Sequence, residues 1–317
     1  MPEISELHRV DLQSGRITKL RWSHDGRLLA IPTQSGSTAI FDIDAGQVTQ
    51  TLEGRSEVTA VGWDPRSNLI MTCSLDRSIA LWELEGGRST PFTISGHIKP
   101  VHSVQWTDEG AFALTCSPDR IRALDGCCLL AGWTEEMEDG VNKTTGFTAA
   151  GCSGQSSFLL AMAAQNGAVL VLANLMSADV LDSIEMEQPV RTLAWSPAED
   201  LLAVGSGDGI VTFRATHEGF LDPAPELTHH APEVHALAFS YDGRVLASRD
   251  AQGLKIWDVA GATLIVALDE KIEMPSSSLP PPQIAFHPAR PLLATVNTNG
   301  TAFRIADLSE LARTSVG

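Results

Sequence analysis

Several common signals of location and partner are missing from this chain. No apolar run approaches the roughly 18 residues of a membrane span, and the start, MPEISELHRVDLQ, lacks the apolar stretch of a signal peptide. Positive charge is scarce, because 22 Lys and Arg stand against 39 Asp and Glu, a net charge of −17. Phosphate groups repel such a surface, which argues against nucleic acids and anionic membranes as partners. We expect a soluble, cytoplasmic protein.

Cysteine is sparse and has no metal-binding pattern. The five cysteines form neither a CxxC pair nor a zinc-ligand spacing: Cys73, Cys116, Cys127, Cys128 and Cys152. They are scattered through apolar segments, as buried reduced thiols of an intracellular protein would be. We therefore expect no metal site and no cofactor.

Common catalytic motifs are missing as well. The chain has no GxSxG elbow, no P-loop and no HExxH pair. The glycine-rich stretch GSGDG at 205–209 falls in a turn between two expected strands rather than at the start of a helix. It is therefore a poor phosphate cradle, and we expect no enzymatic activity.

What the sequence does contain is a repeat. Six similar segments each end an alternating strand on an aromatic anchor: Trp22, Trp63, Trp106, Trp195, Phe239 and Phe286. The gaps between successive anchors are 41, 43, 89, 44 and 47 residues. Because 89 is two periods, a degenerate copy is expected from residue 146, with Cys152 or Ser153 in the aromatic position. Seven copies then account for almost the whole chain.

Each copy predicts four short strands. The anchor is followed by a turn such as SHDG or SYDG, then by a Leu- and Ala-rich strand such as RLLAIP. A third strand ends in an aromatic residue and an acid, as in IALWEL at 79–84, and a weaker fourth strand closes the unit. One such sheet cannot bury both of its apolar faces, but sheets arranged radially pack against two neighbours each.

These motifs resemble the WD-repeat β-propeller family over all 317 residues. Trp257-Asp258 matches the family's Trp-Asp signature, Trp82-Glu83 and Phe41-Asp42 are close variants, and SGH at 95–97 matches the Gly-His position. The resemblance implies an all-β fold, a single seven-bladed β-propeller of four-stranded antiparallel blades. The blades are expected to start near residues 17, 58, 101, 146, 190, 234 and 282.

The two ends of the chain also fit a propeller. The seventh copy stops one strand short, and ELHRVDLQ at 6–13 has the character of a strand. In the family an N-terminal strand completes the last blade, so we expect residues 6–13 to close the ring and remove its open edges. The alternative is that residues 1–13 form a disordered lead.

The resemblance also implies structural hydrogen-bonded tetrads, each made of a His, a Ser or Thr, an Asp and the Trp of one blade. The second blade keeps Ser74, Asp76 and Trp82; the third keeps His97, Ser117 and Asp119; the sixth keeps His230, Ser248 and Trp257, with Asp250 one position out of register. No blade has the full set. We therefore expect a ring held mainly by apolar packing.

In the family, residues four and six positions before each anchor ring the top opening of the channel and contact bound peptides. Here the ring and a neighbouring turn position give these candidate partner-binding residues: Arg16, Glu57, His102, Arg191, Glu233, His235 and Arg249. Such a mixture of charges could hold a charged peptide segment. The alternative is a merely solvated rim, and His102 and His235 could also meet across the channel and bind a metal.

Two segments exceed what the repeat needs, an acidic one at 132–143 and a proline-rich one at 270–283. Both link consecutive blades, where insertions either carry function or have none. The resemblance implies a non-catalytic scaffold or adaptor for protein partners, monomeric alone and part of a larger complex. The alternatives are a regulatory subunit of a separate effector enzyme and a lyase or hydrolase with a channel site.

Overall fold

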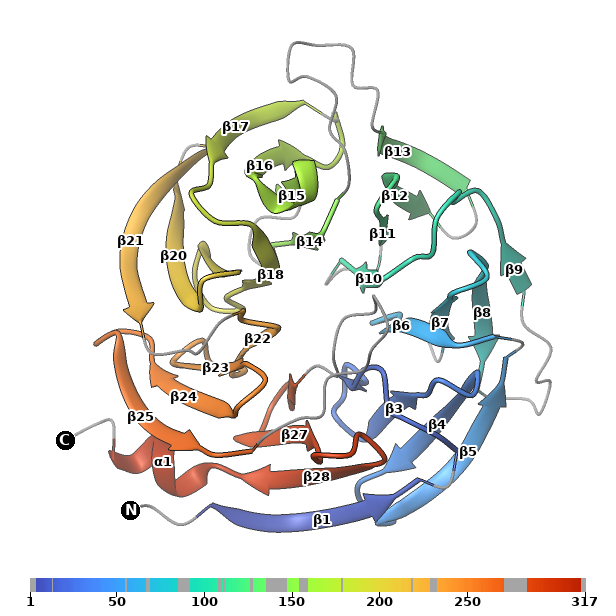
Figure 1. The fold of residues 1–317 in the computed structure, drawn as a ribbon. Coiled ribbons are helices and arrows are strands. Elements are labelled where there is room, and N and C mark those ends of the chain that lie inside the picture. The colour runs from blue at the N-terminus through green and yellow to red at the C-terminus, as the bar shows by residue number, and fades with distance from the viewer. Residues whose placement is uncertain are drawn as a thin grey trace.

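The computed structural model describes residues 4–12, 14–54, 56–66, 69–84, 92–107, 110, 112–125, 128–134, 147–153, 159–177, 179–217, 219–228, 233–270 and 284–314. Within these ranges the chain forms seven four-stranded antiparallel sheets, arranged as blades around a central axis (Figure 1). The predicted fold class, an all-β propeller with seven blades, is confirmed.

In the first four blades the strands follow the chain from the axis outward. Blade 1 contains β2 to β5: Arg21–Trp22, Leu28–Pro32, Ser37–Asp42 and Gln47–Glu53. Blade 2 contains β6 to β9: Val58–Trp63, Leu69–Ser74, Ile79–Glu83 and Phe92–Ile94. Blade 3 contains β10 to β13: Ser103–Trp106, Ala113–Ser117, Arg120–Asp125 and Cys128–Thr134. Blade 4 contains β14 to β17: Ala149–Cys152, Leu159–Ala164, Val169–Asn174 and Val180–Glu185, with the 3-10 turn η1 at Gln165–Gly167.

Two further blades repeat this order and the last one departs from it. Blade 5 contains β18 to β21: Val190–Trp195, Leu201–Ser206, Ile210–His217 and Phe220–Thr228. Blade 6 contains β22 to β25: Ala236–Phe239, Val245–Arg249, Leu254–Asp258 and Thr263–Leu268. Blade 7 contains β26 to β28 (Ala285–Phe286, Leu292–Val296 and Ala302–Asp307) and the N-terminal strand β1 (Ser5–Asp11), and the short helix α1 (Ser309–Thr314) follows it.

Strand β1 closes the ring. It pairs antiparallel with β28, from Ser5 opposite Asp307 to Asp11 opposite Ala302, with a bulge between Glu6 and His8. The two ends of the chain therefore share one sheet (Figure 1). The predicted closing strand is confirmed, and the pairing covers the outer edge of β28.

The residue that follows each aromatic anchor caps the turn into the second strand. In blade 1, Ser23 Oγ accepts a hydrogen bond from the Leu28 backbone N–H at 2.9 Å. Side chains at the same position in other blades accept backbone N–H groups of their own turns: Asp64, Thr107, Ser196, Ser240 and His287. Short polar side chains that replace backbone acceptors are the usual way to make such turns tight.

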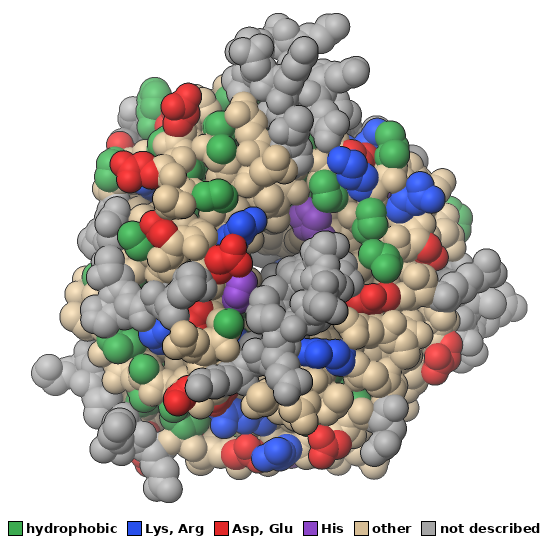
Figure 2. Space-filling view, viewed as in Figure 1, with side chains coloured by type: hydrophobic (Ala, Val, Ile, Leu, Met, Phe, Trp, Pro, Cys, Tyr) green, Lys and Arg blue, Asp and Glu red, His purple; other side chains and the backbone are tan. Residues whose placement is uncertain are grey.

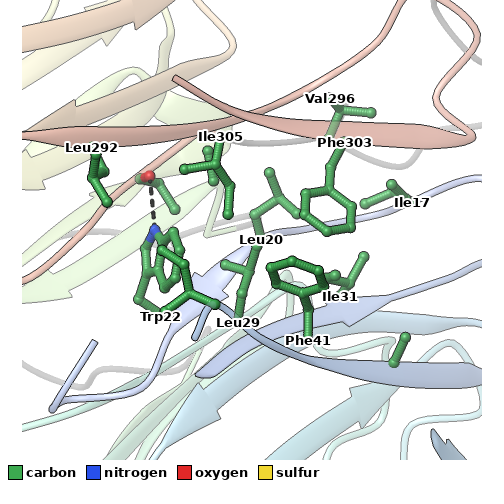
Figure 3. Close-up of a cluster of buried hydrophobic side chains, with 14 residues drawn as sticks. Ile17, Leu20, Trp22, Leu29, Ile31, Phe41, Leu292, Val296, Phe303 and Ile305 are labelled. Atoms are coloured by element: carbon green, nitrogen blue, oxygen red, sulfur yellow. Dashed lines mark hydrogen bonds between the residues drawn. The ribbon is translucent and has the colours of Figure 1, made fainter. Parts of the chain in front are cut away.

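The hydrophobic core lies between the blades. In the described part of the chain, seven buried clusters each draw their side chains from two neighbouring blades. Figure 3 shows the cluster that joins blade 7 to blade 1, where the rings of Phe41 and Phe303 meet edge to face with centroids 5.2 Å apart. Each blade therefore buries both faces, as the radial arrangement predicted.

Three of the four tryptophan anchors add hydrogen bonds between blades, whereas the buried indole N–H of Trp106 has no partner among the described residues. An indole N–H reaches the carbonyl oxygen of the residue just before the anchor position of the preceding blade. The three examples are Trp22 to Ala285 at 3.2 Å (dashed in Figure 3), Trp63 to Arg21 at 3.0 Å and Trp195 to Gly151 at 2.9 Å. A buried N–H needs such a partner, so these tryptophans position neighbouring blades as well as filling the space between them.

Candidate functional site: the channel and its mouth

The innermost strands of all seven blades surround a channel with a volume of 390 Å³. Figure 2 shows a hollow at the centre of one face, with Lys or Arg, Asp or Glu, and His side chains gathered at its rim. Of the predicted mouth residues, His102, Arg191 and His235 line the channel. They come from blades 3, 5 and 6, and each stands four residues before the anchor of its blade.

Arg191, Glu233 and His235 are brought together. Arg191 Nη2 donates to Glu233 Oε1 at 3.0 Å, and the two side chains are 40% and 44% exposed. Glu233 has a positive φ of 65°, and its backbone N–H bonds to the Gly207 carbonyl at 3.2 Å, which fixes the start of blade 6. Burial lowers the pKa of His235. The charges of Glu233 and Asp250 raise this pKa and that of Arg191 lowers it, each by less than burial does. This imidazole is therefore neutral at pH 7.

Arg16 and Glu57 lie apart from that group, at the start of blades 1 and 2. Gln34 connects the two. Its backbone N–H donates to the Arg16 carbonyl at 2.9 Å, and its side chain forms a hydrogen bond with the Glu57 carboxyl group. Burial nonetheless raises the pKa of Glu57. The predicted ring is therefore split into an Arg191 side and a Gln34 side.

His102 lies inside the channel wall rather than on the rim. Its Nε2 hydrogen donates to the Phe147 carbonyl at 3.1 Å, and burial lowers its pKa to about 4. A neutral imidazole already bonded to a backbone carbonyl is poorly placed as a docking contact. In the described ranges no group of three or more His, Cys, Asp and Glu residues could hold a metal ion.

The prediction that Arg249 contacts a partner needs correction. Arg249 ends β23 and is only 1% exposed, because its side chain turns from blade 6 into the junction with blade 7. There its Nη2 donates to the Val296 carbonyl at 3.0 Å and lies 3.9 Å from Glu270, which also pairs with Arg304. Burial lowers the pKa of Arg249 to about 10. Arg249 is a structural residue of the blade junction.

The tetrad of blade 2 also differs from the prediction. The indole N–H of Trp82 donates to Thr72 Oγ1 at 2.8 Å and not to Ser74. Trp82 lies opposite Ile70, so Thr72 follows on the same face, whereas Ser74 ends the strand and donates to the Glu57 carbonyl at 3.0 Å. Asp76 is exposed and accepts from the backbone and side chain of Ser78.

The polar group of blade 3 is more complete. His97 is buried between two hydroxyls, with Nδ1 2.7 Å from Ser117 Oγ and Nε2 3.0 Å from Thr115 Oγ1. Ser117 in turn donates to Asp119 Oδ1 at 2.8 Å. Leu124, buried in the core, stands where a tryptophan would close the set. Burial lowers the pKa of His97 to about 4, which fits a structural role.

In blade 6 the Trp257 indole donates to Ser248 Oγ at 2.6 Å. Asp250, the acid predicted to be out of register, is fully buried and accepts the Gly253 backbone N–H at 2.8 Å and the Lys255 ammonium at 3.1 Å. His230 lies outside the described residues. So do residues 135–143 of the acidic link and 271–283 of the proline-rich link.

Sequence reasoning missed Lys19, a buried channel residue whose ammonium reaches from blade 1 to the His102 carbonyl of blade 3 at 2.7 Å. It stands three residues before its anchor, where blade 7 has Gln283 and the five other blades have small side chains: Ala60, Ser103, Ala149, Thr192 and Ala236. That departure from the repeat was a signal available in the sequence.

Comparisons with known proteins agree with this architecture. Residues 6–66 match the model of the anaphase-promoting complex subunit 4 WD40 domain. Residues 88–129, 182–213 and 222–258 match the model of the WD domain, G-beta repeat. With its seven four-stranded blades, the chain belongs to the WD-repeat β-propeller family.

Among its relatives, the chain is 24% identical over 265 residues to cell division cycle 20.4, cofactor of APC complex, of Arabidopsis thaliana. That alignment covers 81% of the chain and 59% of the relative. It is 21% identical over 281 residues to WD repeat-containing protein slp1 of Schizosaccharomyces pombe, covering 87% and 56%. The chain thus spans about three fifths of the length of these relatives.

A solved structure shows the same fold. The Cps50 (Swd1) β-propeller domain of Myceliophteria thermophila superposes with a TM-score of 0.79 at 18% identity, covering 94% of this chain and 98% of that one. At this identity the match concerns architecture alone. No helix in the described ranges is long and apolar enough to cross a membrane.

Proposed function

We propose that this propeller is a non-catalytic adaptor that presents its channel mouth to a protein or peptide partner. The support comes from the exposed Arg191–Glu233 pair at the mouth. Relatives named as a cofactor of a complex, and as the transcriptional corepressor LEUNIG_HOMOLOG of Arabidopsis thaliana, favour a role in protein assemblies. The rigid ring supplies the scaffold, and the mouth supplies the recognition groups.

The arrangement at the mouth suits a partner segment that carries both polar and charged groups. An ion pair with both side chains about half exposed contributes at most ~1 kcal/mol to stability, so a partner can separate Arg191 and Glu233 at little cost. Each then becomes one half of a charge-assisted hydrogen bond to the partner. Neutral His235 adds a hydrogen-bonding group beside them.

The test is affinity purification from the native cell with substitutions to glutamate on the two faces of the ring. The double variant Arg191→Glu/His235→Glu changes the mouth, and Arg244→Glu changes a 74% exposed arginine in the turn between the first two strands of blade 6. We expect the mouth variant to lose the partners that the wild type and Arg244→Glu retain. If all three proteins recover the same partners, the mouth is not the docking site.

A second function deserves its own test because relatives are named as a cofactor and as a subunit of a complex. In this form the propeller would regulate a separate effector enzyme rather than only join other proteins. The activity of a co-purifying enzyme should then change when the wild-type propeller is added back to a depleted extract. An enzyme whose rate is the same with and without the propeller contradicts the regulatory form and leaves the adaptor form intact.

A further inference from the structure

The channel wall has a charge balance opposite to that of the whole protein. Its lining includes three basic residues with long side chains and three histidines: Lys19, Arg21, Arg191, His24, His102 and His235. Among the described lining residues there is neither an Asp nor a Glu, although the chain as a whole carries 39 of them. Glu233 stands near the rim, where Arg191 engages it at 3.0 Å. Deeper in, no described lining residue offers the Lys19 ammonium a carboxylate.

Lys19 is the clearest case. The residue is 8% exposed, and its ammonium donates to the His102 carbonyl oxygen at 2.7 Å. Within the described residues it forms no ion pair with a carboxylate. A buried ammonium with one neutral acceptor has lost most of its hydration and gained little in return. An anion in the channel would restore the balance.

The titratable groups around Lys19 do not supply that anion. Burial raises the pKa of the Cys73 thiol to about 12, and burial also raises that of Cys116, so both are neutral at pH 7. His102 is neutral as well, and Arg21 adds repulsion. Lys19 itself has its pKa lowered to about 8, chiefly by burial, and remains mostly charged at pH 7.

We propose that the channel binds a small anion, a carboxylate or a phosphate, through the Lys19 ammonium, with Arg21 next to it. The volume of 390 Å³ is within the ordinary range for small-molecule sites. It holds a compact anion together with several waters, each of which takes about 30 Å³. Arg191 and His235 line the same channel nearer its mouth, where Glu233 pairs with Arg191.

This site is independent of the proposed adaptor function. Lys19 lies inside the channel and Arg191 is partly exposed at its rim, so either property can exist without the other. An occupied channel would also place a fixed negative charge below the mouth. If the channel binds no anion, the expected result of the affinity purification with the mouth variant stays the same.

Calorimetric titration tests the proposal directly. Inorganic phosphate and succinate are the two probes, each at constant ionic strength set with chloride, and the proteins are the wild type, Lys19→Met and Lys99→Met. Lys99 is exposed and does not line the channel, so its variant removes the same charge elsewhere. We expect the wild type to bind one equivalent of at least one probe, and the stronger probe identifies the anion class.

The variants then separate a built site from general attraction. Lys19→Met should weaken binding at least tenfold, whereas Lys99→Met should stay within twofold of the wild type. No binding of either probe to the wild type, or equal weakening by both variants, overturns the proposal.

A second measurement covers the case in which Lys19→Met fails to fold. In the wild type, the Cε resonances of labelled lysines report each pKa. Saturating anion should raise the pKa of Lys19 from about 8, because an opposite charge favours the ammonium, and should leave Lys99 unchanged. A Lys19 titration that both probes leave unaltered also overturns the proposal.

Discussion

At the scale of single residues, two buried tryptophans are each oriented by one hydroxyl group on the neighbouring strand. Trp82 donates to Thr72 at 2.8 Å and Trp257 donates to Ser248 at 2.6 Å. Both hydroxyls lie two residues beyond the residue that pairs with the tryptophan across the sheet. Because side chains alternate between faces, that position puts the hydroxyl on the same face as the indole.

This geometry makes a prediction for Thr72→Val, which keeps the shape of the side chain and removes the acceptor. The buried Trp82 N–H would lose its partner, so the free energy of unfolding should fall by ~1–3 kcal/mol. A double-mutant cycle with Trp82→Phe, followed by chemical denaturation, measures the coupling. We expect a clear coupling for Thr72→Val and near-additivity for Ser74→Ala. Coupling to Ser74 instead of Thr72 would contradict the observed hydrogen bond.

Lys19 predicts a dependence of stability on pH. Its folded pKa is about 8, below its ordinary value of 10.5, so the folded state disfavours the charged form. Between these two pH values the unfolded chain binds more protons than the folded one, and stability therefore rises with pH. The rise should total about 3 kcal/mol, since each unit of pKa is worth about 1.4 kcal/mol.

The measurement is the difference in unfolding free energy between wild type and Lys19→Met from pH 7 to 11. The difference matters because the buried thiols Cys73 and Cys116, whose pKa values burial raises, lower the stability of both proteins in alkali. Lys19→Met should be the more stable protein at pH 7, and the gap should close as pH rises from 8 to 10.5. A gap that is constant with pH would show that the Lys19 pKa is not lowered.

Single residues are also where sequence reasoning is weakest. Ser74 and Thr72 are both hydroxyls in one strand, and only the pairing register decides which of them meets Trp82. Arg249 has the sequence position of a turn residue, yet its side chain is buried against blade 7. A repeat alignment places Cα positions well, but it carries no information on how a long side chain turns between two blades.

At the scale of the elements, strand β1 matters more than its position at the start of the chain suggests. It supplies the fourth strand of blade 7, and Val10 packs against the cluster that joins blade 7 to blade 1. Without it, the edge of β28 and part of that cluster would face solvent. An exposed edge strand beside apolar surface promotes association between molecules.

We therefore predict that deletion of residues 1–13 lowers the midpoint of thermal unfolding and promotes aggregation at high protein concentration. A synthetic peptide of residues 4–14 should restore part of the midpoint, because the pairing with β28 depends on register and not on chain continuity. A peptide of the same composition in scrambled order is the control. If the truncated protein unfolds at the wild-type midpoint, β1 does not hold the ring closed.

The elements were far easier to predict than the site. Anchors recurring at intervals of 41 to 47 residues reveal the blades, and the double interval of 89 reveals the blade that lacks an aromatic anchor. In blade 4 the anchor position is held by Cys152, which is buried, as are four of the aromatic anchors: Trp22, Trp63, Trp106 and Phe239. The period survives because every blade must meet the same two neighbours, whichever side chain fills the space.

At the scale of the whole molecule, the propeller separates its charges. The protein carries a net charge of −17, while the described lining of its channel contains lysine, arginine and histidine and no carboxylate. At the mouth of that channel, Arg191 and Glu233 form an exposed pair, and the seven apolar clusters between blades hold the frame rigid. Rigid scaffolds that present a few polar groups at one opening are suited to recognition.

The most direct test of the central claim is photo-crosslinking in the native cell from the two faces of the ring. A photoreactive amino acid is placed at position 233 in the mouth of one protein and at position 242, in a turn of blade 6 away from the mouth, of another. The adaptor account predicts crosslinks to a defined protein partner from position 233 and none to that partner from position 242. Crosslinks to the same partner from position 242 alone, or equally from both positions, would contradict it.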